Sequence, residues 1–277
     1  MVERRNGMLW YPTLYEGFEY SPNVIYTGAA PNQNSAKLVD NLIEVYGNRF
    51  FLIGSDYMYP RESNRIMREL LDVRGGAVVA ERYLDLRAGP RDFKPVMRDV
   101  KRLQPDVIFS TVVGDATAYL YQSYIDAGLD PDTMPIASLT TSEAEIGLMG
   151  ADGGEGHLTA ASYFESVDSE ANRSFVSRYK ARFGDDQSTN MCVEAAYFQV
   201  HLFAKALAET SSLDTDVLRP MVLGSEFDAR QGHIAIDTNS SHTDLWTRIA
   251  RANRCGGFDI VMESGLAVKP DPYLMSL

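Results

Sequence analysis

Neutral hydroxyl groups gather in three short segments, each of which continues a run of apolar residues. The segments read "GSDYMYP" (54–60), "STVVGDAT" (110–117) and "ASLTTSEAE" (137–145). If the apolar runs are parallel strands, their carboxyl ends share one edge of a sheet, where open α/β sheets bind ligands. Hydroxyls donate and accept hydrogen bonds without charge, whereas a phosphate or carboxylate calls for Arg, Lys or free helix amides. The pattern therefore predicts a pocket for a small, uncharged ligand.

Ordinary structural roles also account for several of these residues. Thr140 followed by Glu143 matches a capping box, which would place Thr140 at a helix start. Tyr57 and Tyr59 follow a strand, where a tyrosine often packs its ring and leaves its hydroxyl in water. The segment "LWYPTLYEGFEYSPNVIYTG" (9–28) has six aromatics but neither strand alternation nor helical spacing, so packing against a domain is its simplest explanation. Structural and ligand-binding roles both stay open at this point.

Signatures of enzymes and metal sites are missing from the sequence. It contains no G-x-S-x-G, no H-E-x-x-H, no P-loop and no G-x-G-x-x-G. "GADGGEG" (150–156) carries two acidic residues that would repel a phosphate, so we expect a flexible turn. The histidines have no shared metal spacing, and Cys192 and Cys255 lie too far apart in sequence to suggest a metal site or a disulfide framework. We expect no catalysis, no metal and no cofactor.

Composition narrows the class of protein further. The chain has 277 residues, of which 45% are hydrophobic, and a net charge of −12. Clustered Lys and Arg are needed to bind nucleic acid or an anionic membrane, and this charge argues against both. The first twelve residues have no apolar stretch of the kind found in a signal peptide, and no run approaches the ~20 apolar residues of a membrane span. Taken as it stands, the chain is expected in the cytoplasm.

Apolar periodicity predicts alternating strands and helices up to about residue 162. Strands are expected at 49–55, 77–86, 106–113 and 134–139, and helices at 60–76, 92–103 and 115–128. This alternation is typical of a doubly wound parallel sheet. The later residues read mainly as helices, at 168–184, 190–210 and 214–224, followed by a strand or hairpin at 227–243 and a closing segment that includes 256–265. The first twenty-six residues show no obvious sheet of their own. The sequence thus indicates an α/β protein with two lobes.

Several motifs together resemble a known family. "YPTLYEGFEYSPNVIYTGAAPNQNSAKLV", "FLIGSDYMYPRESNRIMRELL", "IFSTVVGDATA", "ASLTTSEAEIG", "EAAYFQVHLF" and the closing "PDPY" resemble the amide-binding regulator of aliphatic amidase operons. More broadly they are similar to the urea and short-chain amide substrate-binding proteins of ABC transporters. The resemblance runs through nearly the whole chain.

The resemblance implies a type I periplasmic-binding-protein fold, in which two doubly wound parallel-sheet lobes are joined by three crossing strands. Members of the family are longer at the N-terminus, so we expect an N-terminally truncated chain with an incomplete first lobe. Residues 1–27 and 163–235 would form lobe 1, and residues 28–162 and 236–277 would form lobe 2. The crossings would lie near 24–28, 157–164 and 233–237.

Site residues follow from the same resemblance, residue by residue. Tyr11 and Thr13 resemble ligand contacts that reach the cleft from lobe 1, with Leu14 beside them. Tyr57 resembles the hydroxyl that bonds the amide from lobe 2. Thr140 resembles a further contact in the cleft, which is compatible with a capping role.

The resemblance also implies the function: non-catalytic binding of a small neutral amide or urea in an interlobe cleft, as the substrate-binding protein of an ABC transporter with a permease as partner. One alternative is a cytoplasmic amide sensor that regulates an amidase operon through an antiterminator protein. A remote alternative is an amide hydrolase that uses a tyrosine or Asp56. An upstream secretion signal would place the protein in the periplasm or on a membrane as a lipoprotein, and homo-oligomers remain an open question.

Overall fold

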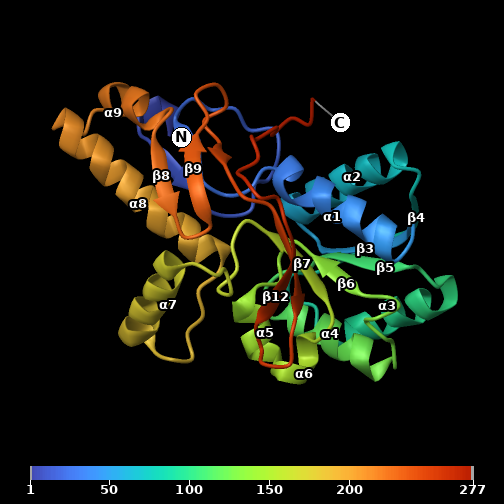
Figure 1. The fold of residues 1–277 in the computed structure, drawn as a ribbon. Coiled ribbons are helices and arrows are strands. Elements are labelled where there is room, and N and C mark those ends of the chain that lie inside the picture. The colour runs from blue at the N-terminus through green and yellow to red at the C-terminus, as the bar shows by residue number, and fades with distance from the viewer. Residues whose placement is uncertain (1, 276–277) are drawn as a thin grey trace.

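A seven-stranded sheet forms the centre of the larger of two groups of elements (Figure 1). The computed structural model describes residues 2–275. The strands of this sheet are β3 (Arg49–Ser55), β4 (Ala77–Leu84), β5 (Val107–Thr111), β6 (Ile136–Ser138), β7 (Leu158–Ala161), β11 (Arg248–Ala252) and β12 (Phe258–Glu263). Their order is β12-β11-β7-β6-β5-β3-β4. Five neighbouring strands of the sheet, β7, β6, β5, β3 and β4, pair in parallel, as predicted. Strands β11 and β12 add an antiparallel edge.

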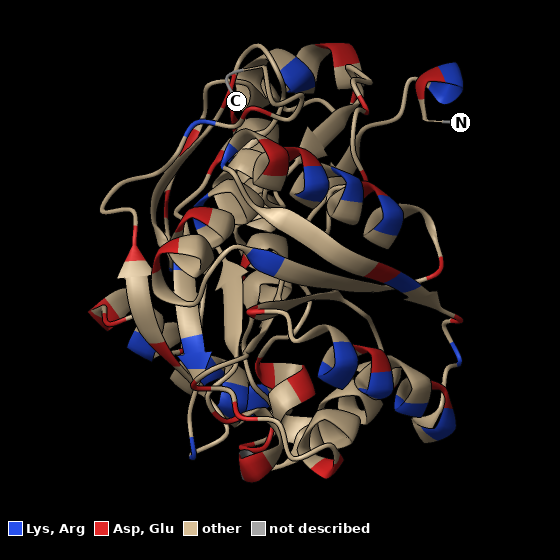
Figure 2. Ribbon diagram, turned by 90° about the vertical axis from the view of Figure 1, so that its right-hand side faces the viewer, with Lys and Arg blue, Asp and Glu red and all other residues tan. Residues whose placement is uncertain are grey.

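Helices cover both faces of this sheet, which is why its strands are continuous apolar runs. They are α1 (Pro31–Val45), α2 (Met58–Val73), α3 (Pro90–Leu103) and α4 (Ala116–Asp126). Successive side chains of a strand point to opposite faces, so Phe50 and Leu52 pack with α1 and α2, whereas Phe51 and Ile53 pack with α3 and α4. Figure 2 shows that the charged residues lie largely along the helices. The larger group therefore holds two apolar layers, one on each face of the sheet.

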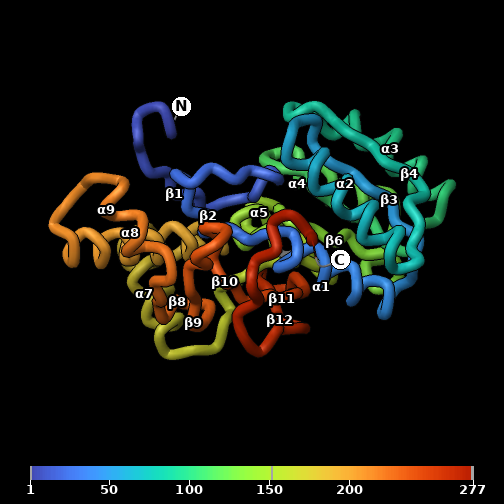
Figure 3. Tube along the Cα trace, turned by 90° about the horizontal axis from the view of Figure 1, so that it is seen from above, coloured from blue at the N-terminus to red at the C-terminus, as the bar shows by residue number. Residues whose placement is uncertain are grey.

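The smaller group holds the N-terminal residues and most of the chain between β7 and β11. Its elements are η1 (Glu3–Arg5), β1 (Leu9–Tyr11), β2 (Val24–Tyr26), α7 (Glu170–Phe183), α8 (Met191–Thr210), α9 (Thr215–Val222), β8 (Glu226–Ala229), β9 (Gly232–Ile236) and β10 (Thr243–Asp244). Seen from above, these elements lie beside the larger group (Figure 3). Ile25 and Ile234 pack against Phe198 and Leu202 of α8 and form a separate core.

Three expectations from the sequence need correction. The first twenty-six residues do contain a sheet, because β1 pairs in parallel with β2, although each strand has only three residues. The turn expected at 150–156 includes a short helix, α6 (Ala151–Gly154). Helix α5 (Glu143–Met149) begins after Ser142 and not after Thr140, since Ser142 Oγ accepts from the backbone N–H of Ala144 and the Glu145 carboxylate accepts from that of Ser142. The capping box is therefore two residues later than predicted.

The chain passes between the two groups after β2, after β7 and before β11. Gln33, buried at the start of α1, joins the first and third of these passages, because its Nε2 donates to the carbonyl oxygens of Thr243 and Val268. The Thr247 hydroxyl donates to the Gln33 carbonyl at 2.7 Å. Strand β10 pairs with β9 and so belongs to the smaller group. We therefore place the third crossing at residues 245–247, after β10, and not near residues 233–237 as expected from the sequence. The lobe boundaries remain a proposal.

No helix in the described part of the chain is both long and apolar enough to span a bilayer.

Candidate ligand-binding cleft

Two adjoining cavities lie where the two groups of elements meet. The inner cavity has a volume of about 30 Å³, which is enough to hold water. The outer cavity has about 180 Å³. Thr13 and Leu14, which follow β1, and Met191 and Cys192, at the start of α8, line both cavities. The opposite walls come from the larger group, so a ligand here would touch both groups at once.

A glycine brings the segment that carries Thr13 and Leu14 into the cleft. A Cβ at Gly28 would stand 1.9 Å from the carbonyl oxygen of Thr13, so only glycine permits this approach. The backbone N–H groups of Thr27 and Gly28 donate to the Tyr11 carbonyl at 2.9 and 3.2 Å. The end of β1 is therefore fixed against the chain that leaves β2, and Thr13 and Leu14 are fixed with it.

Asn190 caps α8 and links it to the larger group. Its Oδ1 accepts from the backbone N–H groups of Cys192 and Val193, both at 3.1 Å. Its Nδ2 donates to the Ser142 hydroxyl at 3.3 Å, across the cleft. The Cys192 thiol lies 3.6 Å from the Thr13 hydroxyl, and burial raises its pKa. The thiol is therefore protonated and a weak nucleophile.

Thr140 forms part of the outer cavity from the larger group. Its hydroxyl donates to the Val112 carbonyl at 2.7 Å, and its backbone N–H donates to the Ser138 hydroxyl at 3.0 Å. The donating hydrogen of Thr140 is thus committed. Its oxygen lies 3.2 Å from the Ser138 hydroxyl, which can donate to it, and keeps the capacity to accept one further hydrogen bond. Such a group suits a ligand N–H.

The lining of the cleft is almost free of charge. Among the described residues, neither cavity is lined by Lys, Arg or His, and Glu145 in the outer cavity is the one charged side chain. Glu145 Oε2 accepts from the backbone N–H and the hydroxyl of Ser142 at 2.7 and 2.6 Å. At the start of α5 the backbone N–H of Ser142 donates to Glu145 and that of Ala144 donates to Ser142 Oγ, and at the start of α8 two backbone N–H groups donate to Asn190. An anionic ligand would find no cation here and would meet a carboxylate.

Tyr59 is one of the cleft residues that the sequence did not select as ligand contacts. Its side chain is 4% exposed and lines the inner cavity. The hydroxyl makes no hydrogen bond of good geometry within residues 2–275, and Ser63 is a polar side chain that lies beside it. Burial raises its pKa, and nearby Ser63 opposes this effect. A buried, unpartnered hydroxyl is costly unless a ligand or water satisfies it.

The predicted residues Tyr57 and Tyr11 line neither cavity in the described structure. Tyr57 is the residue before α2 and is half-buried. Burial and the nearby Glu16 raise its pKa. Tyr11 lines a separate hollow of about 480 Å³ on the smaller group, together with Tyr15 and Tyr26. As ligand contacts, both residues stay predictions, whereas Thr13, Leu14 and Thr140 do lie around the cleft.

Most aromatics of the segment 9–28 pack against their own group. Tyr15 meets Tyr26 edge-on with ring centroids 5.4 Å apart, and Tyr26 stacks on His242 at 4.2 Å. Trp10 meets Phe203 of α8 at 6.4 Å. Aromatic packing therefore explains much of this segment, and the cleft uses its short Thr13–Leu14 stretch.

Two α/β groups joined by three crossings, with a cleft between them, are the arrangement of a ligand-binding clamp. The family model described as "Periplasmic binding protein domain" matches residues 1–277, and the chain therefore belongs to this family. This confirms the fold predicted from the sequence.

Solved structures share the fold. A solute-binding protein of an ABC transporter from Rhodopseudomonas palustris BisB5, in complex with 3,4-dihydroxybenzoic acid, is 24% identical with a TM-score of 0.79, over 90% of this chain and 69% of that chain. An amino acid ABC transporter substrate-binding protein from Pseudomonas fluorescens Pf-5 is 16% identical with a TM-score of 0.81, over 99% and 75%. At these identities the likeness concerns the fold.

A curated relative matches over a shorter stretch. Limonene hydroxylase of Geobacillus stearothermophilus is 30% identical over 126 residues, which is 46% of this chain. The match spans only 23% of that protein.

Proposed function

We propose that this chain is the solute-binding component of an ABC transporter and that it binds a small neutral amide or urea in the cleft. The observation that carries the proposal is the lining of the cleft, which, in the part of the chain that the structure describes, combines hydroxyl groups with a single negative charge and no positive one. The transporter role is supported by the family and by the names of the structural neighbours, with a membrane permease as the partner.

The charge of the cleft argues against the ligands of those neighbours. A benzoate or an amino acid carries a carboxylate, which binds best to Arg, Lys or free amides at a helix start. Here the backbone N–H groups of Ser142 and Ala144 donate to Glu145 and Ser142 Oγ, and those that open α8 donate to Asn190. The carboxylate of Glu145 would in addition repel an anion. A neutral ligand avoids both costs.

An amide or urea matches the donors and acceptors that are left. Its carbonyl oxygen can accept from the Tyr59 hydroxyl, which has no partner among the described residues. Its N–H groups can donate to the Thr140 hydroxyl or to Glu145 Oε1, which makes no hydrogen bond in the described part of the chain. Leu14 and Met191 offer an apolar wall to a short alkyl group. Contacts from both groups would favour the closed clamp through their differential free energy.

Binding without chemistry is the simpler expectation for this cleft. Its one thiol, Cys192, has a raised pKa, and no histidine lines either cavity within the described residues to act as its base. Nucleophilic catalysis needs such a base or a lowered pKa. Incubation with acetamide should release no ammonia, and sustained release would support a hydrolase instead.

Calorimetry tests the proposed ligand class. Acetamide, propionamide and urea are titrated into the purified chain, with benzoate and leucine as the competing ligands. We expect at least one amide or urea to bind more tightly than both carboxylates. Tighter binding of benzoate or leucine than of every amide would overturn the proposal.

A further inference from the structure

Arg248 occupies the junction between the two groups of elements. It is the first residue of β11, immediately after the third crossing, and its side chain is only 2% exposed. Its Nε donates to Glu263 of β12 at 2.5 Å, which keeps the buried guanidinium charge paired. The guanidinium also lies over the Trp246 ring, 5.0 Å from its centroid. This arginine is therefore held by an ion pair within its own group and by a ring contact with the third crossing.

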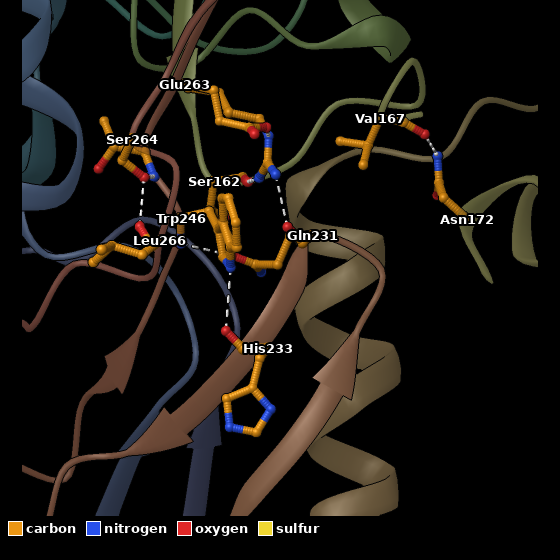
Figure 4. A network of polar contacts seen from close by, with 11 residues as sticks. Ser162, Val167, Asn172, Gln231, His233, Trp246, Glu263, Ser264 and Leu266 are labelled. Carbon is orange, nitrogen blue, oxygen red and sulfur yellow. Dashed lines mark hydrogen bonds and ion pairs between the residues drawn. The ribbon is translucent and has the colours of Figure 1, made fainter. Parts of the chain in front are cut away.

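The remaining donors of Arg248 reach two other segments. One terminal nitrogen donates to the carbonyl of Ser162, just after β7, at 2.5 Å. The other donates to the carbonyl of Gln231, in the β8–β9 turn of the smaller group, at 2.7 Å. Ser162, Gln231 and Glu263 come from different parts of the fold and lie close together in Figure 4. One rigid side chain thus ties the second crossing, the third crossing and the smaller group together.

These partners lead directly to the cleft. Ser162 lines the inner cavity. The Gln231 side chain donates to the buried Glu194 carboxylate at 2.7 Å, and Glu194 lies in the first turn of α8, close to Met191 and Cys192. Gln231 Oε1 also accepts from the Trp246 backbone N–H at 3.1 Å. Both walls of the cleft are therefore connected to Arg248 by hydrogen bonds.

We propose that Arg248 is a positioning residue that fixes the angle between the two groups and so sets the geometry of the ligand cleft. The inference rests on the proposed function, because it assumes that the cleft binds its ligand by closing. Arg248 lines neither cavity of the cleft among the described residues. Lysine at this position keeps the charge that pairs with Glu263 but cannot present the planar fork that reaches two carbonyls at once.

Arg251 provides a matched control on the same strand. It also donates to one carbonyl, that of Gly156, and to the Tyr46 hydroxyl, at 3.0 and 2.6 Å. Both of these partners belong to the larger group. Loss of Arg251 therefore weakens that group without touching the junction.

The test measures the distance between the two groups without any ligand. Spin labels are placed on the exposed Cys255, between β11 and β12, and on Lys205→Cys in α8, in a Cys192→Ser background. Arg248→Met and Arg248→Lys should both shift and broaden the distribution of label distances, with the lysine variant intermediate. Arg251→Lys should leave the distribution unchanged. If Arg248→Met does not fold, the lysine variant decides alone.

Two results would overturn the inference: a parental distribution in Arg248→Lys, or equal broadening in Arg248→Lys and Arg251→Lys. In the chain with Cys192 restored, Arg248→Lys should also weaken acetamide binding about 5- to 150-fold, the range of typical coupling between distant sites. If the parent binds no amide or urea, the proposed function fails, while the distance measurement still decides the role of Arg248.

Discussion

Tyr57 and Tyr59 place their ring centroids 6.4 Å apart, but only Tyr59 lines the cleft. Tyr57 has an extended backbone just before α2, whereas Tyr59 lies in the first turn of that helix. The change from extended chain to helix between them sends the two side chains into different surroundings. The hydroxyl that meets the inner cavity is therefore that of Tyr59.

Replacing Tyr59 by phenylalanine should have opposite effects on ligand binding and on stability. Loss of the hydroxyl should weaken amide binding by about 1–3 kcal/mol, because the ligand carbonyl would lose its donor. The ligand-free chain should become no less stable, since a buried polar atom without a partner is removed. Calorimetry and thermal unfolding measure the two effects. Tyr57→Phe is the control, and an equal loss of affinity in both variants would contradict this assignment.

Replacing Glu145 by glutamine should relax the discrimination against anions. The carboxylate is partly exposed, so its repulsion of a bound carboxylate is worth only ~1 kcal/mol, or about fivefold in affinity. The ratio of acetamide to acetate affinity should therefore fall by about this factor in Glu145→Gln. Because surface charges are screened, the difference between parent and variant should shrink in high salt. An unchanged ratio at low salt would show that Glu145 does not face the ligand.

Stability should fall as the pH rises from about 5 to 8. Burial raises the pKa of Glu143 to about 8 and that of Glu194 to about 7, well above the ordinary value for a glutamate. An acid whose pKa is raised in the folded state holds its proton more tightly there than in the unfolded chain. Its contribution to stability is therefore complete at a pH below the pKa of the unfolded chain, and it is lost as the pH rises through the pKa of the folded state. The free energy of unfolding should decrease by at most ~1.4 kcal/mol per pH unit for each group.

Glu143→Gln should make this decline less steep. The amide oxygen can still accept from the backbone N–H of Glu165, the bond that Glu143 makes at 2.7 Å. Denaturant unfolding at several pH values gives the slope for each chain. Glu194 still titrates in the variant, so part of the decrease in the free energy of unfolding with pH should remain. Identical slopes in parent and Glu143→Gln would mean that Glu143 titrates normally.

Gly28→Ala should disrupt the cleft through a steric effect. The new Cβ would overlap the Thr13 carbonyl, so the segment with Thr13 and Leu14 must move. We expect a loss of stability of about 1–3 kcal/mol, typical of overpacking, and a clear loss of amide binding. Gly89→Ala is the control, because a Cβ there meets no atom within 4 Å. Wild-type affinity in Gly28→Ala would show that the position of this segment is not needed for binding.

The sequence by itself determined the larger group and the chemical character of the cleft. Apolar runs such as Phe50–Ile53 must be covered on both faces, and their alternation with helices leaves a parallel sheet as the natural solution. The carboxyl ends of parallel strands share one edge, so the hydroxyl-rich segment with Thr140 was placed at the cleft from sequence alone. Family motifs added Thr13 and Leu14, which the structure brings to the same cavities.

Only the tertiary structure decided what depends on contacts between distant parts of the chain. Strand β11 was not predicted, because it is defined by pairing with β7, far earlier in the sequence. The cap of α5 lies at Ser142 because Glu145 turns back to it, and the alternative pair Thr140 and Glu143 has the same spacing. The burial of Tyr59 and the junction at Arg248 likewise arise only when separate segments meet, since no local pattern records which carbonyls a guanidinium will reach.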